Sequence, residues 1–174
     1  MDLMIGILRK KLSMMNNITY HLMRKDREIK DKKIIEEIIQ KCKYMTLALC
    51  KNNLPYLVTL SYGYDIEKEV FYFHSANEGR KIDYLRENPN VYGQILVDGG
   101  YSYGNCSHLY RTLNFTGIYK EMSDDGEKIK ALTCMIKTLE KNPDSVLKDQ
   151  VIGKKINAKI GIIENLKFSA KGNF

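Results

Sequence analysis

The apolar residues that open the central part of the chain follow a helical period. They recur at the spacing of one face of an α-helix, with charged or polar residues between them: Ile34, Ile35, Ile38, Ile39 and Cys42. Such a stripe predicts an amphipathic helix that covers a core. Asp31 stands just before it and is a preferred residue type at a helix N-cap.

The period then changes, and alternating apolar residues predict β-strands. Residues 45–50 and 54–62 read as two strands that flank Asn52 and Asn53, where the positive φ angles of a tight turn are tolerated. A second turn leads into a third apolar run at 69–74. These three segments predict an antiparallel meander.

The middle of the chain continues with a short helix and two more strands. The helix is expected at 80–86 and ends before Pro89, because the residue before a proline disfavours helical backbone. Strands are expected at 91–97 and 109–119. The glycine- and tyrosine-rich stretch 99–105 between them is predicted to be a long loop.

The last third combines a long helix with a closing strand. Asp124 and Glu127 have the spacing of an N-terminal capping signature. Alternating residues from Ile156 to Ile162 predict a strand before a Lys- and Gly-rich tail. Short links suit antiparallel pairing and exclude a parallel βαβ sheet. The predicted fold class is therefore mainly β with peripheral helices, a small antiparallel barrel in one domain.

Composition supports a globular protein, and the charge is uneven. Of 174 residues, 44% are hydrophobic and 28% charged, and the 12 Tyr and 5 Phe favour strands. Residues 1–43 hold 11 Lys and Arg against 6 Asp and Glu, which is +5 of the total of +7. A nucleic-acid-binding arm is one interpretation. The alternation of Lys32, Lys33, Lys41 and Lys43 with Glu36 and Glu37 favours a solvated helix face instead.

The cysteines and the apolar runs indicate in which cellular compartment the protein is expected. The four cysteines form no C-x-x-C pair, which argues against a zinc knuckle or a thioredoxin motif and favours reduced thiols in a cytoplasmic protein. The apolar run 3–8 is far shorter than the roughly 18 residues of a membrane span. It also precedes its basic residues, whereas a secretory signal follows them. We therefore expect neither membrane association nor export.

Standard catalytic motifs are missing from the sequence. No P-loop, dinucleotide-binding glycine motif, zinc-protease motif or serine-hydrolase elbow occurs. Cys106 and His108 offer two soft metal ligands, but no third or fourth partner can be named, so no metal site is predicted.

One segment does suggest binding chemistry. The strand that contains His74 ends in small polar residues and passes through Gly79 into a helix that begins with Arg80 and Lys81. Free backbone N–H groups at a helix start, joined by two cations, form an anion site suited to phosphate. The alternative is that Gly79 only makes a turn and the two cations are solvated. His74 is then a barrel histidine rather than a ligand or base.

The same segment carries a family resemblance. Four blocks contribute to it: MRKDREI at 23–29, LPYLVTLSYGYD at 54–65, YFHSANEGRKID at 72–83 and YRTLNFTG at 110–117. In order and spacing the chain resembles the FMN-binding split barrels of the pyridoxamine 5'-phosphate oxidase-like superfamily, in particular the 5-nitroimidazole resistance (Nim) branch. The resemblance covers residues 22–165 and implies one antiparallel split β-barrel domain over 22–174, preceded by an N-terminal extension, 1–21.

The resemblance also implies a homodimer with FMN in two grooves at the subunit interface. The strand beside the isoalloxazine would supply Val58, Thr59, Leu60, Ser61 and Tyr62. His74, Ser75 and Ala76 would surround the flavin and its ribityl chain, and Arg80 and Lys81 would bind the phosphate. A further wall, in part for the partner's flavin, would come from Tyr110, Arg111, Thr112 and Leu113. Thr59 replaces the usual Pro, and Thr112-Leu113 replaces the usual Ser-Val.

The implied activity is electron transfer from a nicotinamide or another donor, through FMN, to a small aromatic acceptor such as a 5-nitroimidazole. His74 would donate a proton or position the acceptor, or else only make hydrogen bonds within the barrel, while Cys106 and His108 would edge the pocket. Tyr62 and Tyr110 are expected to stack on the acceptor ring. The alternatives are a flavin store or redox sensor without turnover, and haem binding through His74 or His108.

The extension 1–21 has a pattern of its own. Its apolar residues recur near helical spacing: Leu3, Ile7, Leu8, Leu12 and Met15. An apolar stripe needs a surface to cover, so we expect this segment to pack against the body of the protein or against a partner subunit.

Overall fold

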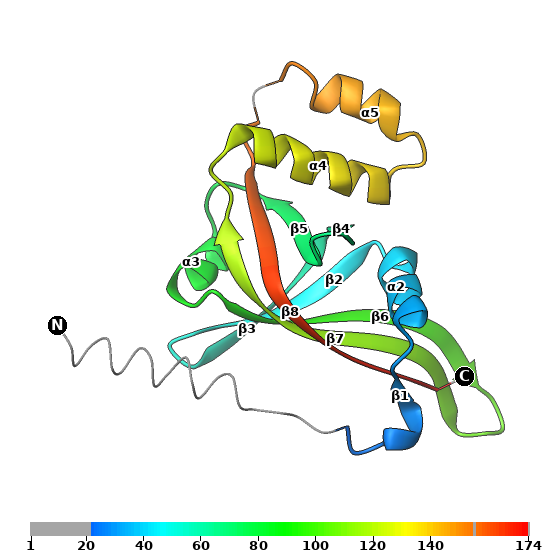
Figure 1. Cartoon of the computed structure of the whole chain (residues 1–174). Coiled ribbons are helices and arrows are strands. Elements are labelled where there is room, and N and C mark those ends of the chain that lie inside the picture. The colour runs from blue at the N-terminus through cyan, green and yellow to red at the C-terminus, as the bar shows by residue number, and fades with distance from the viewer. Residues whose placement is uncertain (1–21, 155, 174) are drawn as a thin grey trace.

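Eight strands form one antiparallel sheet that does not close (Figure 1). The computed structural model describes residues 22–154 and 156–173, so the expected packing of residues 1–21 lies outside the described residues. The order across the sheet is β3-β2-β6-β7-β8-β5-β4, and β1 is added to β8. The strands are β1 (Glu28–Ile29), β2 (Tyr44–Lys51), β3 (Leu54–Ser61), β4 (Gly63–Asp65), β5 (Val70–Ser75), β6 (Asn90–Ser102), β7 (Ser107–Glu121) and β8 (Lys159–Asn173).

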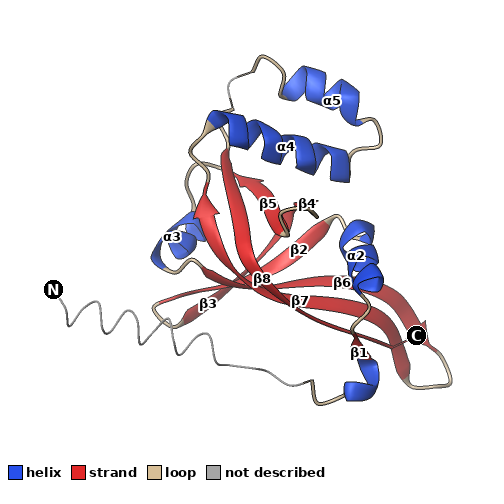
Figure 2. Cartoon of the chain, in the orientation of Figure 1, coloured by secondary structure: helices blue, strands red, loops and turns tan. Residues whose placement is uncertain are grey.

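Helices lie around this sheet, as Figure 2 shows by colour. They are the 3-10 turn η1 (Lys25–Arg27) and the α-helices α2 (Lys32–Lys41), α3 (Arg80–Glu87), α4 (Asp125–Leu139) and α5 (Pro143–Gln150). The predicted architecture, mainly β with peripheral helices and an antiparallel split barrel, is confirmed. The short helix α5 was not expected from the sequence.

The predicted meander of three strands is wrong. β3 pairs with β2, but β5 pairs with β4 and β8. The reason is the segment after β3: Gly63–Asp65 forms the short strand β4, which turns back onto β5. The third apolar run is thereby separated from the second, and β3 is left at one end of the sheet.

The predicted long loop 99–105 is also wrong. β6 runs to Ser102 and β7 begins at Ser107, and the pairing resumes at Tyr101 and His108 after a register shift. Glycine here supplies a bulge rather than a loop, since Gly100 has φ of +84°. The two strands therefore form an arm that projects beyond the rest of the sheet (Figure 1).

The closing strand is longer than its alternating pattern indicated. β8 continues through the Lys- and Gly-rich tail to Asn173, where it pairs with Tyr110. Along this stretch Phe168 packs against the core and Ala170 is buried, while Lys167 is exposed. The lysines therefore belong to the outer face of a strand, which explains why composition alone suggested an irregular tail.

The predicted N-terminal caps of two helices, α2 and α4, are confirmed. The Asp31 carboxylate accepts a hydrogen bond from the Lys33 N–H at 2.9 Å, and Ile38 and Ile39 of α2 are buried. The Asp124 carboxylate accepts from the Glu127 N–H at 2.8 Å at the start of α4.

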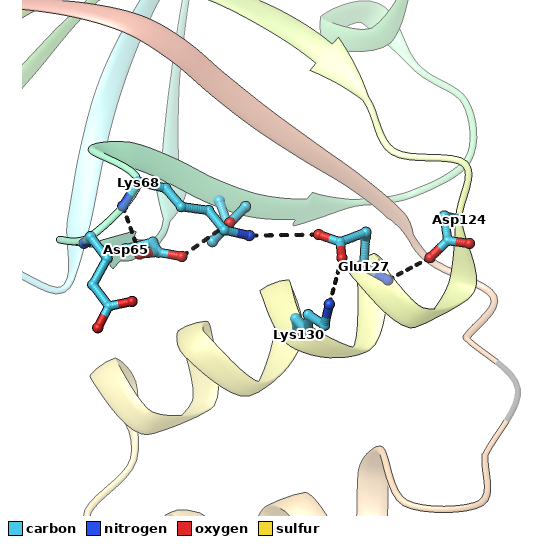
Figure 3. A network of polar contacts seen from close by, with 7 residues as sticks. Asp65, Lys68, Asp124, Glu127 and Lys130 are labelled. Carbon is cyan, nitrogen blue, oxygen red and sulfur yellow. Dashed lines mark hydrogen bonds and ion pairs between the residues drawn. The ribbon is translucent and has the colours of Figure 1, made fainter.

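A polar network connects α4 to the turn before β5 (Figure 3). The Asp65 carboxylate accepts hydrogen bonds from the Lys68 N–H at 3.1 Å and from the Tyr72 hydroxyl at 3.4 Å. The Lys68 ammonium lies 3.6 Å from the Glu127 carboxylate. α4 can approach β4 because Gly63 has no side chain, and a Cβ there would lie 2.8 Å from the backbone of Met135.

Aromatic side chains fill the space that the sheet encloses. The ring of Phe71 on β5 lies 5.3 Å from that of Tyr62, 4.9 Å from that of Tyr64 and 4.8 Å from that of Phe115, centroid to centroid. The ring of Phe168 is 6.3 Å away. These separations are typical of favourable aromatic pairs. One side chain therefore connects β4, β5, β7 and β8.

Phe115 itself depends on a glycine. Its ring lies over Gly93 of β6, where a Cβ would be 2.0 Å from Phe115 Cζ. Both residues are buried, and they are direct partners in the β6–β7 register. The ring therefore uses the space left by the missing side chain.

We expect Gly93→Ala to destabilise the protein. Overpacking a core costs about 1–3 kcal/mol, so the free energy of unfolding should fall by about 2 kcal/mol. Gly126→Ala in α4 is the matched control, because its Cβ would meet only Asp124 Oδ1, at 3.1 Å. Denaturant unfolding followed by circular dichroism measures both. Equal midpoints for the two variants would show that the Phe115 ring does not depend on Gly93.

Candidate functional site

The free edge of β3 forms one side of the candidate site. Over residues 22–154 and 156–173, β3 ends the sheet, so its backbone groups on the side away from β2 have no strand partner there. Thr59 and Ser61 are exposed, and the Thr59 hydroxyl lies 3.1 Å from that of Thr46. Val58 and Leu60 pack against the core. This strand can therefore present backbone groups and two small hydroxyls to a ligand.

Tyr62, just beyond β3, does not face the site. Its side chain is fully buried, and its hydroxyl donates a hydrogen bond to the Ile39 carbonyl at 2.6 Å. Burial strongly raises the pKa of this phenol. The expectation that Tyr62 stacks on a bound aromatic ring is therefore wrong, because its ring is part of the core.

The end of β5 brings His74 and Ala76 to the surface a few residues before α3, while Ser75 between them is buried. His74 is exposed, and its imidazole makes no hydrogen bond with any of the described residues. It pairs through its backbone register with Ile160 of β8. The buried Ser75 hydroxyl donates to the Ala76 carbonyl at 2.8 Å. His74 is thus available to a ligand and is not a hydrogen-bonded barrel histidine.

The start of α3 separates the two cations that the sequence treated as a pair. The Arg80 guanidinium lies 4.6 Å from the ring centroid of Tyr56 and 5.4 Å from that of Tyr84, and it donates a hydrogen bond to the Tyr84 hydroxyl at 3.3 Å. This arrangement is a cation–π contact that connects α3 with β3. Arg80 is therefore already engaged within the protein.

Lys81 differs from Arg80 in both burial and partners. It is half-buried, and within the described part of the chain its ammonium has no ion pair or hydrogen bond. Burial lowers the pKa of Lys81. Gly79, the N-cap of α3, provides no side-chain cap for the helix. An anion at this point would compensate both the lysine and the free N–H groups of the first turn.

The fourth block of the predicted site, Tyr110–Leu113, lies on β7 and away from the β3 edge. Leu113 belongs to the core, and the buried Thr112 hydroxyl donates to the Ile95 carbonyl at 3.3 Å. Arg111 forms an ion pair with Glu37 of α2 at 3.2 Å. β2 and β6 lie between β7 and β3, a separation of roughly 14 Å at the usual strand spacing. Within one chain, Tyr110–Leu113 is therefore not part of the same wall.

Cys106 and His108 lie at the end of the β6–β7 arm rather than beside His74. The His108 Nε2 atom is 3.7 Å from the Asp98 carboxylate, and its ring lies 5.6 Å from that of Tyr101. Across residues 22–154 and 156–173, no three or more His, Cys, Asp and Glu side chains are grouped so as to hold a metal ion.

Sequence reasoning missed Tyr56 and Tyr84. Their rings lie 5.3 Å apart and, together with Arg80, fasten the start of α3 to β3. Tyr84 follows Arg80 by four residues, and this spacing brings two side chains together on a helix, so it could have indicated the contact. Tyr56 gave no such signal, because it lies on β3, a separate element from α3.

Several solved structures resemble this chain in fold. No curated protein matches the sequence significantly. Among solved structures, a candidate 5-nitroimidazole antibiotic resistance protein from Bacteroides thetaiotaomicron is 24% identical with a TM-score of 0.63, over 83% of this chain and 87% of that one. A FAD-binding protein from Mesorhizobium loti is 21% identical with a TM-score of 0.61, over 85% and 98%. A FAD- and haem-binding protein from Mycobacterium smegmatis is 14% identical with a TM-score of 0.68, over 84% and 73%.

In the described part of the chain, no helix is long and apolar enough to cross a membrane.

The similarity to these solved structures shows a shared fold, and the family follows from the sequence itself. The sequence pattern of the family called pyridoxamine 5'-phosphate oxidase matches residues 31–156, which include β2 to α5. The chain therefore belongs to the pyridoxamine 5'-phosphate oxidase family, whose structural neighbours here include flavin-binding split barrels.

Proposed function

We propose that this protein is an FMN-dependent oxidoreductase that passes electrons from a nicotinamide or another donor to a small nitroaromatic acceptor. The observation that carries the proposal is Lys81, which has no partner among the described residues and lies at the start of α3, a helix without a side-chain cap that the Arg80–Tyr56 contact joins to the edge strand β3. Family membership and the flavin-binding neighbours support it. The flavin would supply two-electron transfer, and the protein would bind and orient it.

The residues at the start of α3 fit a phosphate group. Among the described residues Lys81 has no partner, and burial disfavours its charged form, so a phosphate would stabilise the ammonium. Arg80 would act indirectly, because its contacts with Tyr56 and Tyr84 fix the helix start against β3. We therefore assign the phosphate contact to Lys81 and the positioning of α3 to Arg80.

The other walls fit the remainder of a flavin. The edge of β3 from Val58 to Ser61 would hold the isoalloxazine through its backbone groups, and Ser75 and Ala76 would lie along the ribityl chain. His74, which is exposed and makes no hydrogen bond with its imidazole within the described part of the chain, would donate a proton to the reduced acceptor or orient it.

A second copy of the chain would complete the site. The outer face of β3, β2 and β6 exposes Leu57 (66%), Tyr92 (47%) and Leu96 (51%) around polar pairs such as Thr46 and Thr59. Contiguous apolar exposure of this kind is typical of protein interfaces. A homodimer through this face would bury it, and the partner could supply Tyr110 and Arg111, which lie too far away within one chain, whereas Thr112 and Leu113 are buried.

The phosphate assignment is tested by Lys81→Glu. Replacing the cation by an anion should lower FMN affinity at least about a hundredfold, because an ionic hydrogen bond is lost and a repulsion is added. Lys141→Glu, an exposed change between α4 and α5, is the charge-matched control and should retain FMN. Flavin absorbance after gel filtration and fluorescence titration measure both. Undiminished FMN binding by Lys81→Glu would place the phosphate elsewhere.

The dimer is tested on its apolar face. Each chain has a mass of 20.2 kDa, and light scattering should show a species of about twice that mass. Leu57→Lys combined with Leu96→Lys should shift the protein to monomers and release the flavin, since two buried charges are costly at an interface. Ile152→Lys, at an equally exposed position (67%), should leave the mass unchanged. A flavin-loaded monomer of the parent protein would contradict a shared site.

Turnover is tested by anaerobic stopped-flow mixing of the photoreduced holoprotein with a 5-nitroimidazole. Reoxidation at the flavin absorption band should be at least about tenfold faster than for free reduced FMN, because the site orients the acceptor. His74→Ala should slow this step while flavin remains bound. A rate equal to that of free FMN would instead indicate a flavin store or redox sensor.

A further inference from the structure

The β6–β7 arm is only two strands wide over most of its length. β8 accompanies β7 as far as Tyr110, and beyond that point β6 and β7 pair with each other alone, up to Ser102 and Ser107. Their register also shifts between Asp98 and Tyr101. A two-stranded hairpin is only marginally stable in water by itself. The position of the arm therefore depends on contacts with the rest of the chain.

One such contact is made by the side-chain amide of Asn173, the last residue of β8. Asn173 pairs with Tyr110 in the β7–β8 register. Its Nδ2 atom reaches beyond this pair and donates hydrogen bonds to the Ser107 hydroxyl at 2.7 Å and to the His108 carbonyl at 2.8 Å. Both hydrogens of the amide are thus used. They hold the end of β8 against the arm, beside which β8 ends in Figure 1.

These hydrogen bonds lie next to the two residues that the proposed dimer would use. β8 places Asn173 opposite Tyr110 and Gly172 opposite Arg111, so both residues belong to the last three-stranded part of the sheet. Strand ends are where local opening occurs most readily. If the end of β8 separated from β7, Tyr110 would become part of the two-stranded arm. Glu37 of α2 holds the Arg111 side chain at 3.2 Å, whereas Asn173 holds the backbone beside it.

We propose that Asn173 is a positioning residue for the flavin site of the partner subunit. The proposal rests on the proposed function, in which Tyr110 and Arg111 complete that site. Asn173 itself touches neither flavin nor acceptor. It acts through the arm, because its two hydrogen bonds keep Tyr110 and Arg111 in one arrangement before the ligand binds, which raises the ligand's apparent affinity.

The first test removes the two hydrogen bonds. Asn173→Leu retains the approximate size of the side chain without its donors, so hydrogen exchange at the amides of residues 101–109 should be about tenfold faster. FMN should bind about fivefold more weakly, because fewer molecules hold the arm in place. Ser107→Ala removes one acceptor and should give a smaller change in both measurements. Asn142→Leu is the control, because Asn142 is exposed and its side chain does not cap α5.

A mixed dimer tests in which subunit Asn173 acts. One chain carries Asn173→Leu and the other Lys81→Glu, and two different affinity tags isolate the pair. If Asn173 serves the partner's site, one of the two sites combines an intact Lys81 with an intact arm. Half of the sites should then bind FMN with the affinity of the parent. If Asn173 serves its own chain, both sites are impaired, and the absence of any site with parent affinity would overturn the proposal.

Failure of the proposed function gives a different result. A parent protein that retains no FMN contradicts the flavin proposal, and the role of Asn173 falls with it. A parent that binds FMN overturns the role of Asn173 alone if Asn173→Leu leaves either the exchange of the arm or the FMN affinity unchanged.

Discussion

The packing of Phe71 in the barrel interior is the contact on which the arrangement of the sheet depends. Its ring touches the rings of Tyr62, Tyr64, Phe115 and Phe168, which come from the β3–β4 region, β7 and β8. The sheet order separates β3 from β5 by four strands, yet this cluster holds the β3–β4 region against β5 inside one core. The sheet is thus folded upon itself while the outer edge of β3 remains free to meet a ligand.

Sequence patterns predicted what is decided locally. The caps at Asp31 and Asp124 and the Asn52-Asn53 turn, with φ angles of +50° and +62°, each involve neighbours within a few residues. The pairing of β5 with β8 was missed because it joins residues almost ninety positions apart. The arm was missed for another reason: in residues 99–105, glycine marks a bulge within a ladder as readily as a loop.

The candidate site, too, has parts that the sequence could predict and parts that it could not. The motif from His74 to Lys81 follows one continuous path, so its residues could be located together from the sequence. The different roles of Arg80 and Lys81 could not, because they depend on Tyr56, which lies 24 residues before Arg80. The burial of Tyr62 was equally hidden, since an aromatic residue after an edge strand can face either side. Alternation predicts faces within a strand but not beyond its end.

In the proposed dimer, the position of Tyr110 and Arg111 would make ligand binding and assembly parts of one equilibrium. These residues are separated from the β3 edge by two strands in the same chain, so a site that uses both needs a partner. A ligand shared between subunits stabilises the dimer by its own binding free energy, and the dimer in turn raises the ligand's affinity. α2 takes part in this coupling, because its Glu37 forms an ion pair with Arg111 and thereby helps to fix the side chain that the partner's site would use.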